Sequence, residues 1–179
     1  MNKKKIFLLG GVILEILLCV EFVLFSYSVL KIIRYMILLA GLLALAWIDY
    51  HEKKIPNKIL KVLLLIRMVF LVPEWLLFKE LGFSLFLASG MGLLVGGGLF
   101  LIVYFLSKGG VGMGDVKLMG VTGAYVGIGG IMPTVFLTVM ISAVYSIVML
   151  LLRKIKLKEE IPFAPFVLAG TAMAMAFGM

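Results

Sequence analysis

Two aspartates are the residues of this sequence whose type and setting best fit catalysis. Asp49 ends an apolar run, in LLALAWIDYHEKKIPN, and Asp115 closes the glycine-rich stretch GGVGMGD. Two carboxyl groups brought together in a poorly hydrated site do not both ionise easily, so one stays protonated while the other is charged. Such a pair can activate water against a peptide bond, because the charged group accepts a proton from water and the protonated group donates one to the substrate.

The glycines before Asp115 suit such a site. Gly112 and Gly114 have no side chain, so the backbone can approach an extended substrate closely. A phosphate-binding loop is one alternative, but the stretch lacks the Gly-Lys-Ser/Thr of a P-loop and is not a regular G-x-G-x-x-G. A plain flexible connector is another. Lys117, two residues after Asp115, either favours the ionised form of that aspartate or faces lipid headgroups.

Each aspartate alone also has a structural explanation. An Asp at the start of a helix often caps free N–H groups, and an Asp at the end of an apolar run often reaches interfacial water. The catalytic interpretation therefore depends on the two acids being on the same side of the elements that carry them.

Those elements are membrane-spanning helices. Hydrophobic residues make up 64% of the 179-residue chain and charged residues 15%, and the mean hydropathy is +1.22, which is far outside the range of soluble domains. At about 20 residues for each crossing, the chain holds about six or seven spans in an all-α bundle and no separate soluble domain. The apolar runs are 6–26, 34–50, 58–77, 83–106, 115–128, 131–152 and 162–178, of which the fifth is short and rich in glycine.

If these spans alternate, three basic segments fall on one side of the membrane. They are MNKKK at the N-terminus, HEKKIPNK at 51–58 and RKIKLK at 153–158, and the positive-inside rule makes that side cytoplasmic. Two full spans separate Asp49 from Asp115, so both emerge on that same side. This topology predicts a multi-pass protein of the cytoplasmic membrane, with its candidate site facing the cytoplasm.

Composition also excludes other classes of site. Cys19 is the only cysteine and His51 the only histidine, so we expect no disulfide framework, no metal site and no cofactor. The net charge of +8 lies in short segments between apolar runs and forms no continuous stripe, so the expected partner is the lipid bilayer and not nucleic acid. Arg67, inside a predicted span, is expected to pair with Glu15, Glu21 or Glu74 or to extend toward the interface.

The motifs together resemble those of the type IV prepilin peptidases, which are polytopic aspartyl proteases of the G-x-G-D kind. Asp49 is followed by five residues and Ile55-Pro56-Asn57, and Asp115 closes GMGD. The later segment IPFAPFVLAG is similar to the family's Pro-Phe-Gly-Pro-Phe segment, with Ala164 in place of glycine.

This resemblance implies a function. Residues 1–179 would be one peptidase domain, with 1–33 a less conforming N-terminal span and 34–179 the core. The partners would be prepilins or pilin-like proteins, whose short basic leader is cut on the cytoplasmic side. The chain has no paired Cys-x-x-Cys motifs, so we expect no N-methylation. Asp49 and Asp115 would be catalytic; the residues expected to bind substrate or shape the loop are Gly112, Gly114, Lys117, Pro56 and Asn57.

Two other classes of protein are alternatives to a peptidase. One is a small transporter or channel that uses Asp49 and Asp115 as a proton or cation relay, although such acids would be expected near the middle of the membrane. The other is a noncatalytic subunit of a pilus or secretion machine, which would need neither acid.

Overall fold

The computed structural model describes residues 3–107, 110–154 and 161–178. These residues form helices and connecting loops without a strand, which confirms the predicted all-α class. The helices are α1 (Lys3–Leu24), α2 (Val29–Glu52), α3 (Asn57–Leu77), α4 (Gly82–Leu106), α5 (Met113–Leu151) and α6 (Ala164–Ala176). Four of them, α1, α2, α4 and α5, are long and apolar enough to cross a membrane.

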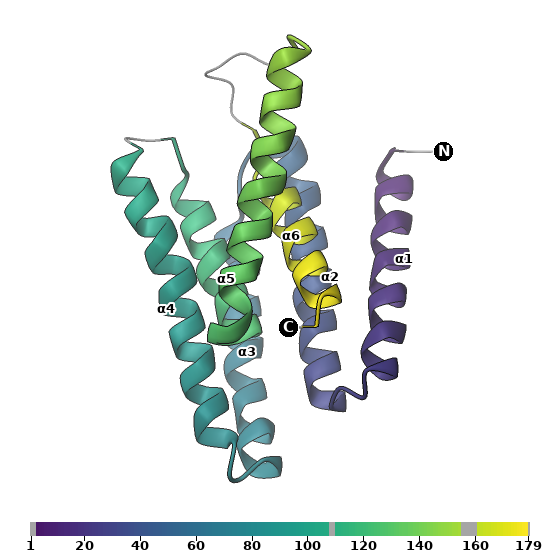
Figure 1. Cartoon of the computed structure of the whole chain (residues 1–179), viewed down its shortest axis with the longest axis vertical. Coiled ribbons are helices and arrows are strands. Elements are labelled where there is room, and N and C mark those ends of the chain that lie inside the picture. Colours follow the sequence, from purple (N-terminus) through teal and green to yellow (C-terminus); the bar gives the residue numbers. More distant parts are fainter. Residues whose placement is uncertain (1–2, 108–109, 155–160, 179) are drawn as a thin grey trace.

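The helices alternate in direction, as the predicted spans require. Figure 1 shows α2 and α4 ending at the same end of the bundle, where α3, α5 and α6 begin. The segment 51–56 and Arg153–Lys154 therefore lie at one end, which we call the basic end. Gly109 of the glycine-rich stretch, Met1 and Asn2, and residues 155–158 of the third basic segment lie outside the described residues.

Helix α5 is two helical segments joined by a sharp reversal. Gly127 has φ 75° and ψ 179°, a conformation that essentially only glycine adopts. The first segment (residues 113–126) runs from the basic end part of the way into the bundle, and the second segment (residues 128–151) runs back (Figure 1). The predicted spans 115–128 and 131–152 thus correspond to separate segments, with the break at residue 127.

Side chains from neighbouring helices satisfy the backbone at this break. A helix that ends leaves its last carbonyl groups without partners, which is costly in an apolar medium. Arg67 Nε donates to the carbonyl oxygen of Ala124 at 2.9 Å, and Ser89 Oγ donates to the same oxygen at 2.7 Å. The positive charge of Arg67 also complements the negative end of the helix dipole.

Glu74 holds Arg67 in this position and pairs with a second arginine. Its Oε2 lies 2.8 Å from Arg67 Nη1, and its Oε1 lies 2.7 Å from Arg34 Nη1. All three residues are at most 7% exposed. Of the three partners expected for Arg67, the structure therefore selects Glu74, and the role of the cluster is structural.

Glycines bring α4 and the first segment of α5 into direct backbone contact. A Cβ added to Gly123 would clash with the carbonyl oxygen of Gly92. No adjustment of a flexible side chain can relieve a clash with backbone. Small residues at such interfaces allow close helix packing in membranes.

Gly123→Ala is therefore expected to destabilise the protein by about 1–3 kcal/mol, the usual cost of overpacking. Chemical unfolding in detergent measures the change. Gly98→Ala is the matched control, because a Cβ at Gly98 meets nothing within 4 Å. Equal stability of the two variants would contradict the close approach of α4 and α5.

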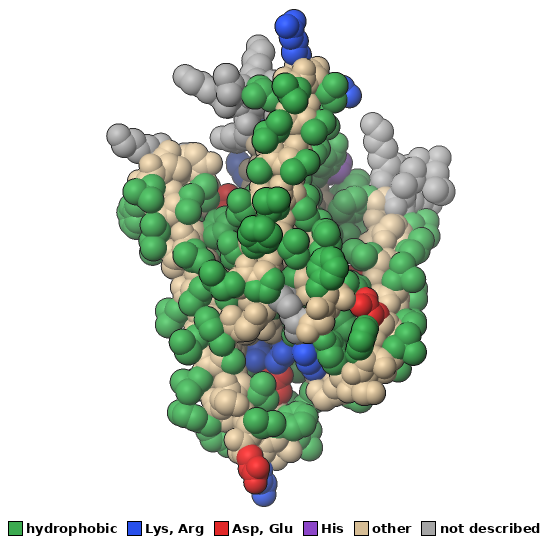
Figure 2. All heavy atoms as spheres, viewed as in Figure 1, with side chains coloured by type: hydrophobic (Ala, Val, Ile, Leu, Met, Phe, Trp, Pro, Cys, Tyr) green, Lys and Arg blue, Asp and Glu red, His purple; other side chains and the backbone are tan. Residues whose placement is uncertain are grey.

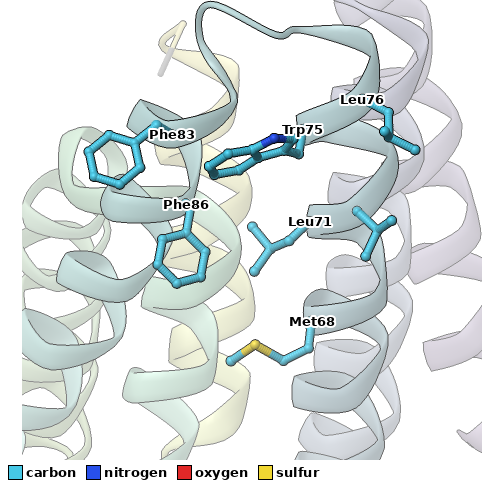
Figure 3. A pocket seen from close by; sticks show the side chains of 7 residues that line it. Met68, Leu71, Trp75, Leu76, Phe83 and Phe86 are labelled. Atoms are coloured by element: carbon cyan, nitrogen blue, oxygen red, sulfur yellow. The ribbon is translucent and has the colours of Figure 1, made fainter.

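The outer surface between the ends is mostly hydrophobic, as expected for a chain surrounded by lipid (Figure 2). An open groove of about 510 Å³ lies between α3 and α4. Figure 3 shows Met68, Leu71, Trp75, Phe83 and Phe86 around it. Since Trp75 is near the end of α3 and Phe83 near the start of α4, this groove is at the end of the bundle opposite to the basic end.

Candidate active site

Asp49 lies in the last turn of α2 and is almost completely buried. Only 5% of its surface is exposed. Its Oδ2 accepts a hydrogen bond of 2.8 Å from the backbone N–H of Ala164, the first residue of α6. The α2 residues below it, among them Leu42, Leu45 and Ala46, are fully buried, so the helix points this face toward the core and carries the carboxylate with it.

Asp115 lies in the first turn of α5 and is half-buried. Its Oδ2 accepts a hydrogen bond of 3.0 Å from the backbone N–H of Gly112, and its own N–H donates to the carbonyl of Gly112 at 3.0 Å. The side chain thus caps the start of α5, as the structural explanation predicted. Capping occupies one carboxylate oxygen and fixes the direction of the side chain.

The two carboxyl groups lie at the same end of the bundle, the basic end, because α2 ends there and α5 begins there (Figure 1). The charge of Asp49 also acts on Asp115. Among the described residues, neither aspartate forms a salt bridge. Each carboxyl group is held by a backbone N–H group, of Ala164 for Asp49 and of Gly112 for Asp115.

The other residues singled out from the sequence join the two motifs. Pro56 precedes the first residue of α3 and is its N-cap. Lys117 Nζ donates to Asn57 Oδ1 at 3.1 Å, so this lysine contacts Asn57 and not Asp115. A Cβ on Gly114 would lie 3.1 Å from Cβ of Ile55, which makes Gly114 the point where the start of α5 packs closely on the segment before α3.

The bond between Lys117 and Asn57 is expected to stabilise the protein by about 0.5–1 kcal/mol, since both side chains are exposed and such bonds contribute little. In a double-mutant cycle, Lys117→Met combined with Asn57→Leu should lose no more stability than the larger single change. Unfolding in detergent gives the four values. Lys58→Met with Asn57→Leu is the control pair, and additivity in the Lys117 cycle would exclude the bond.

Sequence reasoning did not identify the partner of Asp49. The segment IPFAPFVLAG is visible as a motif in the sequence. Its Ala164 lies 115 residues from Asp49, and nothing in the sequence indicates that the two residues are in contact. In the described part of the chain, no group of three His, Cys, Asp or Glu side chains could hold a metal ion.

Comparison with known families addresses the resemblance directly. A sequence model of the type IV leader peptidase family matches residues 36–147, more than half of the chain. The chain belongs to this family. The predicted resemblance is thereby confirmed, and the match includes both Asp49 and Asp115.

Named relatives agree with the family assignment. A prepilin leader peptidase/N-methyltransferase of Bacillus subtilis is 30% identical over 156 residues, which are 83% of this chain and 57% of that protein. Proteins of the same name from Pseudomonas aeruginosa and Stutzerimonas stutzeri are 29% and 30% identical, over 77% of this chain and 47% of each. The chain thus spans about half the length of these relatives. No solved structure gives a significant match.

Proposed function

We propose that this chain is a membrane aspartic peptidase that removes the leader of prepilins or pilin-like proteins. One observation supports the proposal most directly: Asp49, in the last turn of α2, and Asp115, in the first turn of α5, lie at the same end of the bundle. Membership of the leader peptidase family supports the same reaction. The acids lie at helix ends and not near the middle of the membrane, which favours a peptidase over an ion relay.

The proposed reaction is general acid–base hydrolysis. The ionised aspartate takes a proton from water, the water oxygen forms a bond to the scissile carbonyl carbon, and the protonated aspartate donates its proton to the substrate. The C–N bond then breaks, which leaves the leader with a new carboxylate and the pilin with a new amino group. No basic side chain of the described ranges forms a salt bridge with either aspartate, which leaves the two carboxyl groups able to share one proton.

The glycine loop is the expected place for the substrate backbone. Gly112 is exposed beside Asp115, so an extended leader can lie against it without meeting a side chain. Four residues do not contact the substrate backbone in this proposal but hold the start of α5 against the start of α3: Gly114, Lys117, Pro56 and Asn57.

We also propose that the basic end faces the cytoplasm, since exposed Lys53, Lys54 and Lys58 gather there and follow the positive-inside rule. In a Cys19→Ser background, Lys79→Cys and Lys54→Cys report the two ends. A membrane-impermeant maleimide added to intact cells should label the cysteine at 79 and not the one at 54. The reverse labelling pattern would place the site on the other side.

The test of the function uses the full chain in lipid vesicles with candidate pilin-like substrates. Intact-mass measurement should find a shorter mature protein and a free leader, and Asp49→Asn should give neither. With S-adenosylmethionine present, we expect no mass increment of a methyl group on the new N-terminus. Failure of the folded chain to cleave any substrate with a glycine-terminated basic leader would overturn the proposal.

A further inference from the structure

The carboxylate of Asp49 meets the start of a helix that is remote in sequence. Its hydrogen-bond donor, the N–H of Ala164, belongs to a residue with no exposed surface. In such a dry environment a hydrogen bond to a charged group is shorter and stronger than one between neutral groups. This hydrogen bond joins the end of α2 to the start of α6, and the backbone N–H of Phe163, the residue before α6, also acts on the carboxyl group.

The start of α6 has an N–H group available for this purpose. The first N–H groups of any helix lack an intrahelical acceptor. Pro165 has no N–H, and the N–H groups of Phe166 and Val167 donate to the carbonyl of Phe163. No side chain at the N-cap of α6 satisfies the start of the helix. Asp49 therefore acts as the cap of α6 from a different helix.

Aromatic contacts fix the start of α6 against its neighbours. The ring of Phe163 packs on Phe100 of α4 with 5.3 Å between centroids, and the ring of Phe166 packs on Tyr145 of α5 at 5.1 Å. Phe100 is only 6% exposed. The start of α6, which carries the donor to Asp49, is thus packed against α4 and α5.

We infer that the backbone N–H of Ala164 is a positioning group for the reaction: it holds the carboxyl group of Asp49 in place at the end of the bundle that also carries Asp115. This inference rests on the proposed function. Ala164 itself does not touch the substrate in this account, and its small side chain only permits the close approach of α2 and α6. A displaced carboxyl group should slow the chemical step while leaving substrate binding unchanged.

Replacing one backbone amide with an ester tests this directly. Lactic acid incorporated at position 164 keeps the methyl side chain, removes the N–H, and makes the carbonyl of Phe163 the weaker acceptor of an ester. We expect kcat to fall about 10- to 100-fold with KM within about twofold of the parent. The matched control is phenyllactic acid at position 166. It removes an N–H that donates to the carbonyl of Phe163 and not to Asp49, so it also weakens the hydrogen bonding of that carbonyl, and this ester should retain kcat. Equal kcat for both esters, or an effect confined to KM, would overturn the inference.

A second variant decides the question if the ester at 164 does not fold. Phe163→Leu keeps every backbone N–H but weakens the packing on Phe100, so kcat should fall several-fold at constant KM. An unchanged kcat would contradict the inference. The proposed function is judged separately: cleavage by the parent chain and its loss in Asp49→Asn support the peptidase whatever the esters do.

Discussion

Asp49→Asn and Asp115→Asn are each expected to lower the rate of leader cleavage about 10²- to 10⁴-fold, the usual contribution of a general acid or base. Asparagine keeps the size of the side chain and can still accept a backbone N–H bond, so the helix starts at Ala164 and Gly112 should remain formed. It cannot exchange a proton with water. Initial rates of leader release, measured by mass spectrometry with the protein in vesicles, give the effect.

The two changes should not be additive. A shared proton needs both carboxyl groups, so the double variant is expected to be no slower than the worse single variant. Glu52→Gln is the matched control, because Glu52 is an exposed acid one turn from Asp49 on the same helix end, and it should cleave at the parent rate. Normal cleavage by either asparagine variant would rule out the paired-acid mechanism.

Glu74→Ala is expected to destabilise the protein by about 3–5 kcal/mol, because removing one member of a buried ionic cluster leaves uncompensated charge. Here Arg34 and Arg67 would both lose their described anionic partner. The loss should also weaken the contact of Arg67 with the carbonyl of Ala124. Chemical unfolding in detergent, or the yield of folded protein, measures the change.

Glu80→Ala provides the comparison for this prediction. Glu80 lies in the loop between α3 and α4 and is exposed, so its removal should change stability by less than about 0.5 kcal/mol. A Glu74 variant as stable as the Glu80 variant would mean that the arginines find other partners. Replacing Glu74 together with both arginines by apolar residues should restore part of the stability.

The helices and the position of the two acids could be predicted from hydropathy alone. Apolar runs are local signals, and their boundaries agree with α1 to α4 within a few residues. The side of each acid followed from counting spans. The short, glycine-rich run 115–128 corresponds to the first segment of α5, but the reversal at Gly127 was not predicted from the sequence.

Contacts between distant helices could not be predicted in the same way. Arg67 and Glu74 lie seven residues apart on α3 and form a local pair, whereas the second partner of Glu74, Arg34 of α2, depends on how α2 and α3 pack. The bond from Ala164 to Asp49 depends on the packing of α6, which is set by Phe100 and other buried residues. Lys117 was interpreted through its neighbour in sequence, Asp115, whereas the structure pairs it with Asn57.

The closure of the break at Gly127 by Arg67 and Ser89 constrains how the protein is assembled. The first segment of α5 is too short to cross a bilayer alone, and its free carbonyl at Ala124 would be exposed to lipid without these donors. Both donors are on helices that are synthesised earlier. Biogenesis can therefore proceed in chain order, with α3 and α4 forming a template onto which the re-entrant segment is inserted.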